Sequence, residues 1–417
     1  MKKALLYSAL LSTALANGTA SAIEFDGFLT AGFAVHNQEQ TNGSTVTYLD
    51  EVTDKVTFLQ DSKFGLQMTA DVSEDMQVVS QILASAEDDN YRMDIEWAYL
   101  DYSIDDSSSF RVGRIKQPVF LISDYLEVGY AYPWIRPPHE AYNNMPVDSL
   151  IGVELLYSTT IGGMNLMLQP YFGSNTEAIP GFTTARFFAD NYIGMAIRLE
   201  SSVFTFQLSS FKTDVSTTDT SVGAGGTNLI SEGTAVLSVA SMSWDVANFI
   251  GYAEYTTRDI EQEGTPSSTS AFNKVAFDSL FSDQDGYYVT LGYRMGKFLP
   301  HITYAVADSD PKSLSPMCLD VNNPLTCGPS QGARQNSITL GLRYEINDST
   351  ALKMEFQTVE LDNNAANFGL YQPTPVNAAG VPITTTACGG TTCTPAGQAQ
   401  FTDDTASIIS VAVDIIF

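Results

Sequence analysis

Histidine and cysteine often carry nucleophilic or metal chemistry, and this chain has few of either. Its three histidines, His36, His139 and His301, lie far apart in the sequence, and none has the spacing of a zinc ligand. The sequence contains no Gly-x-Ser-x-Gly nucleophile turn and no phosphate-binding loop. We therefore predict that the protein is not an enzyme and that it holds no metal or cofactor.

The four cysteines form two local pairs. Cys318 and Cys327 share a Pro/Asn-rich stretch, whereas Cys388 and Cys393 share a Gly/Thr-rich stretch. In an oxidising compartment, such neighbours by default form short-range disulfides. We predict that each pair closes a small loop on the extracellular face.

Charged residues are scarce and mostly acidic. They make up 16% of the chain, below the roughly 25% of soluble proteins. The 48 acids outnumber the 20 bases, for a formal net charge of −28, which argues against nucleic acid as a partner. Four carboxylates lie in one long segment, 118–148: Asp124, Glu127, Glu140 and Asp148. If that segment lines a narrow aqueous passage, its fixed charge favours cations.

The same segment is also rich in aromatic residues and prolines. Prolines restrict the backbone and favour extended conformations, so a rigid aromatic ridge is expected. Two interpretations stay open: a stacking surface for a sugar or aromatic solute, or packing that fixes the segment to a wall. The aromatic residues are Tyr125, Tyr130, Tyr132, Trp134 and Tyr142, set among Pro118, Pro133, Pro137, Pro138 and Pro146.

Residues 1–22 have the features of a signal peptide. A basic start, Met1-Lys2-Lys3, precedes an apolar stretch from Ala4 to Ala16, and Ala20-Ser21-Ala22 is an A-x-A cleavage site. A retained anchor helix is the alternative, but the apolar stretch is too short to span a bilayer. We predict export and a mature chain of 23–417.

The elements that position these side chains are strands. Apolar and polar residues alternate in segments of about ten residues, the pattern of a strand with two different faces. For example, Tyr287, Val289 and Leu291 oppose Thr290. We count sixteen such segments: 23–36, 62–71, 76–85, 92–104, 110–117, 150–159, 164–173, 187–199, 203–212, 234–244, 248–258, 286–295, 299–307, 336–346, 350–360 and 407–417.

Short and long connections alternate along the chain. Short ones such as 72–75 and 347–349 separate long ones such as 37–61 and 118–149. This is the pattern of an outer-membrane β-barrel, with periplasmic turns and extracellular loops.

Closure of the sheet into a barrel is required because every backbone polar group in lipid must be paired. We predict an all-β, sixteen-stranded transmembrane antiparallel barrel. A secreted β-sandwich or solenoid is the alternative, but its connections would not sort into two lengths.

The last segment, 407–417, ends on Phe417 and resembles the C-terminal strand of Gram-negative outer-membrane barrels, whose terminal Phe is read by the barrel-assembly machinery. Asp61-Ser62-Lys63-Phe64-Gly65-Leu66, Ser109-Phe110-Arg111-Val112-Gly113-Arg114 and the long segment after it are similar to the general porin family. The resemblance covers the mature chain in architecture, but in sequence only these patches.

The resemblance implies a homotrimer in which the third extracellular loop folds into the barrel and narrows it. The loop acids would then be Asp124, Glu127, Glu140 and Asp148, facing Lys63 and Arg114 on the wall. Two further wall positions that the family fills with basic residues are Phe28 and Leu156 here. A charge at the aqueous rim with no role is the alternative for Lys63 and Arg114.

We therefore expect a water-filled channel for passive diffusion of small hydrophilic solutes and ions, with a preference for cations. Its surroundings would be outer-membrane lipid and lipopolysaccharide. Two alternatives remain: adhesion or receptor roles of the long loops, and a barrel that hydrolyses lipid, which would need a nucleophile and a histidine base on one wall.

Overall fold

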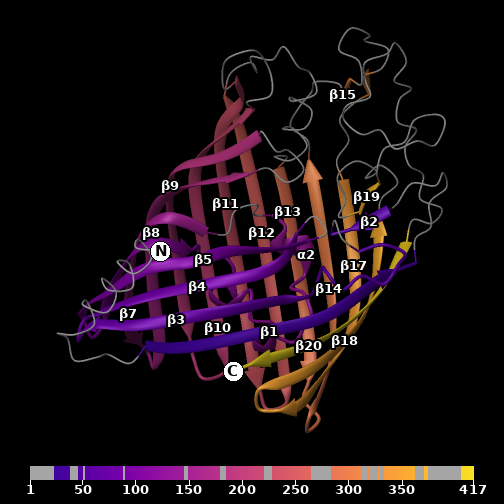
Figure 1. Cartoon of the computed structure of the whole chain (residues 1–417), viewed down its shortest axis with the longest axis horizontal. Helices are drawn as coiled ribbons and strands as arrows, with labels where there is room; N and C mark the ends of the chain where they lie inside the picture. Colours follow the sequence, from indigo (N-terminus) through magenta and orange to yellow (C-terminus); the bar gives the residue numbers. More distant parts are fainter. Residues whose placement is uncertain are drawn as a thin grey trace, which may run out of the picture.

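The computed structural model describes residues 23–37, 46–49, 52–87, 90–144, 149–178, 185–219, 228–263, 283–310, 317–318, 327–328, 333–361, 371–373 and 405–417. The predicted signal peptide, 1–22, lies outside this range. Sixteen strands pair antiparallel with their neighbours and close into one barrel (Figure 1). In chain order they are β1 (Ile23–His36), β3 (Lys63–Ser73), β4 (Met76–Glu87), β5 (Asn90–Asp105), β6 (Ser108–Lys116), β7 (Ser149–Ile161), β8 (Met164–Ala178), β9 (Ala185–Glu200), β10 (Phe204–Asp219), β11 (Asn228–Val246), β12 (Phe249–Glu263), β13 (Asp283–Tyr293), β14 (Phe298–Asp310), β17 (Ala333–Asn347), β18 (Thr350–Leu361) and β20 (Thr405–Ile416).

Each of the sixteen predicted segments coincides with one strand, so the predicted fold is confirmed. The strands are longer than the prediction mainly where they meet long connections. For example, β10 continues to Asp219 instead of ending at 212, and β11 begins at Asn228 instead of 234. Outside the bilayer both faces of a strand meet water. Apolar and polar residues then no longer need to alternate, so the sequence pattern does not show where the strand ends.

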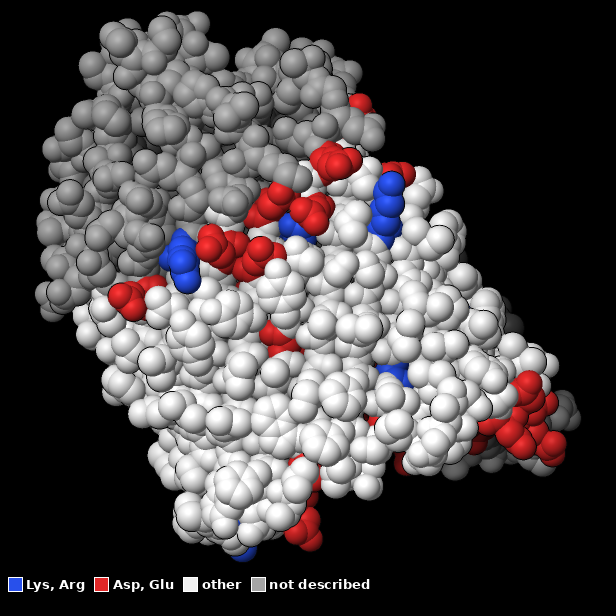
Figure 2. All heavy atoms as spheres, turned by 180° about the vertical axis from the view of Figure 1, so that it is seen from behind, with Lys and Arg blue, Asp and Glu red and all other residues white. Residues whose placement is uncertain are grey.

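The two faces of the wall differ as the alternation requires. In β13, the outward Val289 and Leu291 are 42% and 51% exposed, whereas the inward Tyr288 and Thr290 are 1% and 0% exposed. Figure 2 shows that a broad band of the outer wall carries few charged side chains and that acidic groups gather toward its ends. This band is the surface that lipid hydrocarbon requires.

Aromatic rings collect on the outer face near the short turns. Phe249 lies 4.8 Å from Tyr293, and Phe298 lies 4.9 Å from Tyr344, between ring centroids. All four residues lie close to the short turns, Phe249 and Phe298 at the first residue of their strands. Girdles of aromatic residues flank the apolar band of outer-membrane barrels, so these rings mark one border of the membrane.

The first and last strands close the barrel. β1 pairs with β3 on one side and with β20 on the other. Just beyond that ladder, the Gly27 N–H donates to the Phe417 carbonyl at 2.7 Å, and the Phe417 N–H donates to the Gly27 carbonyl at 2.9 Å. The Phe417 ring also stacks on Phe64, with centroids 6.3 Å apart. The last residue therefore joins the seam.

Deleting Phe417 should reduce the fraction of protein that reaches the heat-modifiable, membrane-inserted form. The deletion removes the paired backbone hydrogen bonds to Gly27 and the ring contact with Phe64 at the seam. Electrophoresis of heated and unheated membrane fractions measures this form. Phe417→Tyr keeps the ring and the backbone groups and serves as the control. Wild-type assembly after the deletion would rule out a role for this residue.

Within the described residues, four short strands lie outside the barrel. β2 (Val46–Tyr48) pairs with β19 (Tyr371–Pro373), and β15 (Met317–Cys318) pairs with β16 (Cys327–Gly328). The helical elements are short: η1 (Ser123–Tyr125), η2 (Gly129–Ala131) and α2 (His139–Tyr142). None of the helices in the described part of the chain has the length and hydropathy of a membrane span.

Candidate functional site: the third loop across the lumen

The connection between β6 and β7, residues 117–148, is the third loop, and it is described as far as 144. It contains η1, η2 and α2 and enters the barrel instead of extending from it (Figure 1). Pro118, Pro133, Pro137 and Pro138 lack backbone N–H donors, so the loop cannot join the sheet as an ordinary strand. Its backbone is bonded instead to side chains of the wall.

The start of the loop is held by β9 and β10. The Gln207 side-chain amide donates to the carbonyls of Pro118, Val119 and Phe120 at 3.1–3.2 Å. The Arg198 guanidinium donates to the Leu121 carbonyl at 3.0 Å. These bonds satisfy buried carbonyls at the start of the loop, and the Ser209 hydroxyl donates to the Val119 carbonyl as well.

A buried carboxylate on β12 joins both arms of the loop. Glu254 is 2% exposed and accepts hydrogen bonds from the Leu121 N–H at 2.9 Å, the Ser241 hydroxyl at 2.6 Å and the Tyr288 hydroxyl at 2.7 Å. The Tyr142 hydroxyl also donates to it. Four donors compensate the cost of burying this charge.

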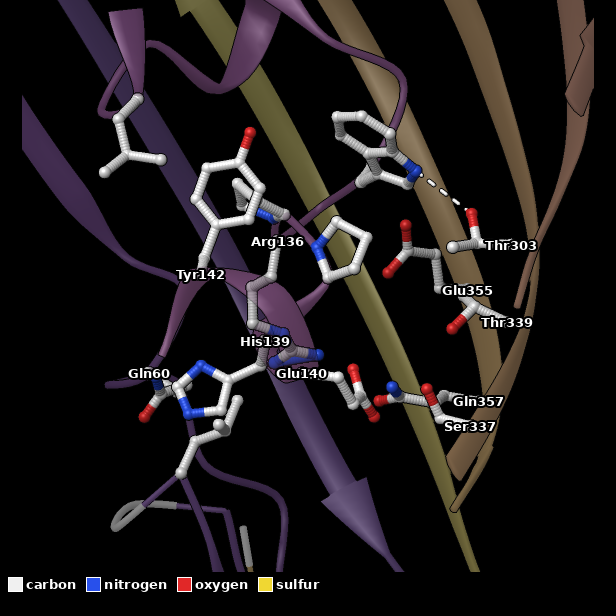
Figure 3. A pocket seen from close by; sticks show the side chains of 15 residues that line it. Gln60, Arg136, His139, Glu140, Tyr142, Thr303, Ser337, Thr339, Glu355 and Gln357 are labelled. Atoms are coloured by element: carbon white, nitrogen blue, oxygen red, sulfur yellow. Dashed lines mark hydrogen bonds between the residues drawn. The ribbon is translucent and has the colours of Figure 1, made fainter. Parts of the chain in front are cut away.

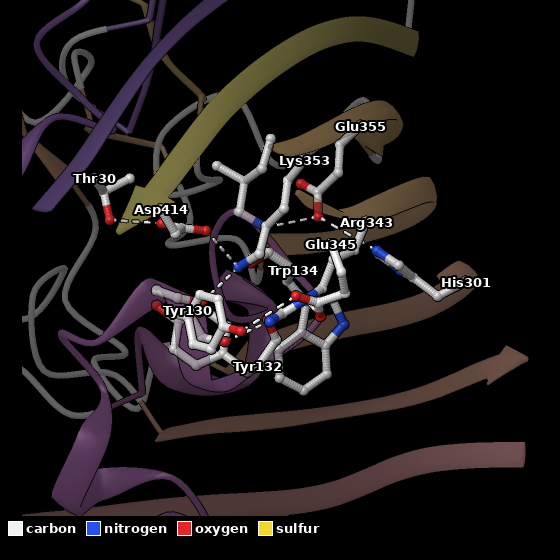
Figure 4. A network of polar contacts seen from close by, with 12 residues as sticks. Thr30, Tyr130, Tyr132, Trp134, His301, Arg343, Glu345, Lys353, Glu355 and Asp414 are labelled. Carbon is white, nitrogen blue, oxygen red and sulfur yellow. Dashed lines mark hydrogen bonds and ion pairs between the residues drawn. The ribbon is translucent and has the colours of Figure 1, made fainter. Parts of the chain in front are cut away.

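The middle of the loop is held by a buried ion pair (Figure 4). The Lys353 ammonium donates to the carbonyls of Gly129 and Trp134 at 2.5 Å and lies 2.9 Å from an Asp414 oxygen. Asp414 also accepts a hydrogen bond from the Thr30 hydroxyl at 2.7 Å. One lysine thus ties the loop to β18 and, through Asp414, to the seam of the barrel.

The aromatic residues of the loop are mainly packing elements. Trp134 is 1% exposed, with its ring edge-on to Tyr252 and Tyr288 at 4.8 and 5.6 Å between centroids. Its indole N–H donates to Thr290 and Thr303 hydroxyls at 3.0 Å. Of the two interpretations of the aromatic ridge, packing against the wall is therefore confirmed for Trp134.

Two glycines allow the loop to approach the wall closely. A Cβ on Gly129 would lie 2.3 Å from an Asp414 oxygen, and a Cβ on Gly286 of β13 would lie 2.3 Å from the Glu140 carbonyl. Either separation is far below van der Waals contact, so any side chain there would displace the loop.

The opposite side of the loop meets basic side chains of β3 and β6. A Glu127 oxygen lies 3.1 Å from the Lys63 ammonium, and the other lies 3.8 Å from the Lys116 ammonium. Lys116 also pairs with Glu96 at 2.7 Å. Burial alone would raise the pKa of Glu127, but Lys63 and Lys116 lower this pKa to about 2. Glu127 is therefore ionised at neutral pH.

A second charged cluster lies on β5, β6 and β7. The Arg111 guanidinium donates to Asp101 at 2.9 Å and to Glu154 at 3.3 Å. Asp124, at the start of the loop, is close enough to Glu154 and Tyr99 to act on both electrostatically. Among the described residues, no base forms an ion pair with Asp124.

Exposure shows which side of the loop water reaches. Side chains facing β3–β6 keep contact with solvent: Lys63 and Asp101 are 20% exposed and Arg111 is 23% exposed. On the other side, Glu254 and Lys353 are only 2% and 1% exposed. Water therefore reaches the third loop from the side of Lys63, Asp101 and Arg111, and we call this side the passage.

The predicted pore residues separate into two groups. Lys63 and Glu127 form an ion pair on the passage side of the loop, and Asp124 lies near Glu154 and Tyr99. Glu140 does not face it: the side chain is 0% exposed and accepts a hydrogen bond from the Gln335 amide at 2.9 Å. Asp148 lies outside the described residues.

Arg114 is placed contrary to the prediction. It pairs with Ala98 and Ile151, and Ile151 is 61% exposed on the outer wall. Directly opposed residues of an antiparallel pair share a face, so this register puts Arg114 on the outward side of β6. The inward arginine of that strand is Arg111, and a shift of one residue reverses the face.

Sequence reasoning missed several residues of the passage. Arg111, Lys116, Asp101 and Glu154 all lay in predicted strands, and the phase of each strand could have placed Arg111 and Glu154 inward. Lys116 had no such signal because it follows the irregular Gly113, which has a φ of +138°.

The cysteine predictions remain open. The register of β15 and β16 sets Cys318 directly opposite Cys327, an arrangement compatible with a disulfide. Cys388 and Cys393 lie outside the described residues. Both disulfides stay predictions.

A closed, sixteen-stranded barrel with few charges on its outer band and a charged, water-accessible lumen defines the class: an outer-membrane channel. The family model of Gram-negative porins matches residues 5–364, and the chain belongs to this family. It is therefore a diffusion channel of the Gram-negative outer membrane rather than an enzyme. No curated protein matches the chain closely enough to count as a relative.

Solved structures agree on the fold at low sequence identity. A loop-deletion mutant of OmpT from Vibrio cholerae has 10% identity and a TM-score of 0.56, covering 95% of this chain and 100% of that one. The channel DcaP of Acinetobacter baumannii has 10% identity and a TM-score of 0.53, covering 96% and 99%. OmpF of Salmonella typhi has 12% identity and a TM-score of 0.50, covering 95% and 98%.

Proposed function

We propose that this porin prefers cations and that the preference is set beside the third loop. The observation that carries the proposal is that Asp124 has no basic partner among the described residues. Lys63, Arg111 and Lys116 at the passage each pair with carboxylates, whereas Asp124 forms no ion pair within the described residues. An uncompensated carboxylate at a narrow passage attracts cations and repels anions.

Replacing Asp124 with asparagine tests the proposal. A unit charge 4 Å from an ion in water contributes about 1 kcal/mol, about fivefold in local concentration. We expect the cation-to-anion permeability ratio to fall by about twofold to fivefold. The reversal potential of the reconstituted channel in a salt gradient measures this ratio.

Glu360→Gln is the matched control, because it removes one carboxylate from the exposed outer wall, where salt screens charges beyond about 10 Å at 0.1 M. A wild-type reversal potential for Asp124→Asn, with conductance intact, would place selectivity at the vestibule.

The remaining parts of the proposal concern export and assembly. Residues 1–22 would direct export, as their signal-peptide pattern indicates. In-vitro folded OmpT of Vibrio cholerae has a trimer form, and a homotrimer is proposed for this chain on that likeness. Lipopolysaccharide and the barrel-assembly machinery are proposed partners on the family resemblance.

A further inference from the structure

A separate cavity lies on the far side of the third loop from the passage. It has a volume of about 180 Å³ and is enclosed by the loop on one side and by β14, β17 and β18 on the other (Figure 3). Arg136, His139 and Tyr142 line it from the loop, whereas Thr303 and Glu355 line it from the wall. A space of this size accommodates a small solute.

One acceptor in this cavity has no partner. Glu140 is 0% exposed, and its side chain points toward Gln357 and Ser337 (Figure 3). One carboxylate oxygen accepts from Gln335 at 2.9 Å, whereas Oε2 has no hydrogen-bond partner among the described residues. Burying a carboxylate oxygen without a hydrogen-bond donor costs free energy, so a ligand that donates to this oxygen would be bound favourably.

The cationic groups around the cavity are already engaged. Arg136 donates to both Asp61 oxygens at 3.0 and 3.2 Å and also to Ser410. Lys353, the nearest other cation to Glu355, pairs with Asp414. Arg136 and Lys353 are thus committed to Asp61 and Asp414, and Lys63, which also acts on Asp61, is paired with Glu127. None of these cations forms an ion pair with Glu140 among the described residues.

Histidine does not supply the missing charge. Burial lowers the pKa of His139 to about 3, and Arg136 contributes to the same shift. His139 is therefore neutral at pH 7 and does not act as the counter-ion of Glu140.

The rest of the lining distinguishes between kinds of cation. Among the described residues there is no group of three or more His, Cys, Asp or Glu side chains suited to a metal ion. Instead, Ser337 and Thr339 offer hydroxyl acceptors beside Glu140, and Leu126, Pro137 and Pro138 offer apolar surface. This combination suits an ammonium head with a short hydrocarbon tail.

We propose that the cavity behind the third loop binds a small primary ammonium ion. The three N–H donors of the ammonium bond with Glu140 and neighbouring hydroxyl groups, and its alkyl chain packs against the proline and leucine side chains. The inference is independent of the selectivity proposed for the passage, because it concerns the opposite side of the loop and its test measures binding.

Isothermal titration of the folded, detergent-solubilised protein with propylammonium chloride tests the proposal. We expect one saturable site per chain and no binding of propan-1-ol, which has nearly the same shape without the charge. Glu140→Gln keeps an acceptor for Gln335 but removes the charge, so affinity should fall about tenfold or more. Ser337→Leu keeps the charge and fills the space, so it should also abolish binding.

Glu74→Gln, in the exposed turn between β3 and β4, is the control for loss of one carboxylate and should bind as wild type does. Wild-type affinity in either cavity variant, or equal binding of propan-1-ol, would overturn the proposal. Calcium chloride alone is the last probe. Calcium binding that is tighter than that of propylammonium and is lost in Glu140→Gln would reassign the cavity to a metal.

Discussion

Replacing Lys353 with methionine should lower the free energy of unfolding by about 3–5 kcal/mol, the range expected when one partner of a buried ion pair is removed. The change leaves Asp414, whose side chain is 2% exposed, with only the Thr30 hydroxyl as a donor. It also removes the donor to the carbonyls of Gly129 and Trp134. The midpoint of denaturant unfolding in detergent measures the loss.

Lys297→Met is the matched control. Lys297 is exposed beside a short turn and donates only to the Ile346 carbonyl, at 2.8 Å, so its loss should change stability by about 0.5 kcal/mol or less. The double variant Lys353→Met with Asp414→Asn should recover part of the loss, because it removes the orphaned charge. Equal stability of Lys353→Met and wild type would show that this pair does not hold the loop.

The second large effect concerns Glu127. Glu127→Gln should lower the cation-to-anion permeability ratio more than Asp124→Asn does, because it removes the carboxylate that pairs with Lys63 and also lies near Lys116. Removing the Lys63 charge as well, in Lys63→Met with Glu127→Gln, restores the wild-type sum of charges. The ratio should then return toward the wild-type value. A double variant as altered as Glu127→Gln would contradict this pairing.

Acid should weaken the contribution of Glu127 to stability. Because Lys63 and Lys116 lower its pKa to about 2, below the roughly 4.3 of an unfolded glutamate, its ionised form stabilises the folded barrel above about pH 4. That stabilisation is lost as the pH falls from about 4 to 2. The difference in unfolding midpoint between wild type and Glu127→Gln should therefore shrink over this interval.

Sequence reasoning could define the barrel because strand periodicity is a local property. In β13, Val289 and Leu291 must face lipid and Thr290 must face the lumen, whatever the neighbouring strands are. The long connection after the fifth strand and the family resemblance indicated the third loop and placed Lys63 on the wall that its carboxylates face. Sequence reasoning failed for Arg114, because a shift of one residue along the strand moves a side chain from the lumen to the outer wall.

By itself, the sequence determined the number of strands, the lipid-facing side of regularly alternating strands such as β13, and the acidic composition of the chain. Only the tertiary structure decided which loop carboxylates meet the passage. The path of the third loop depends on Gln207, Glu254 and Lys353, which lie 87 or more residues from their loop partners. That path turns Asp124 and Glu127 toward water and buries Glu140, because contacts between distant strands, and not local pattern, fix the course of a proline-rich loop.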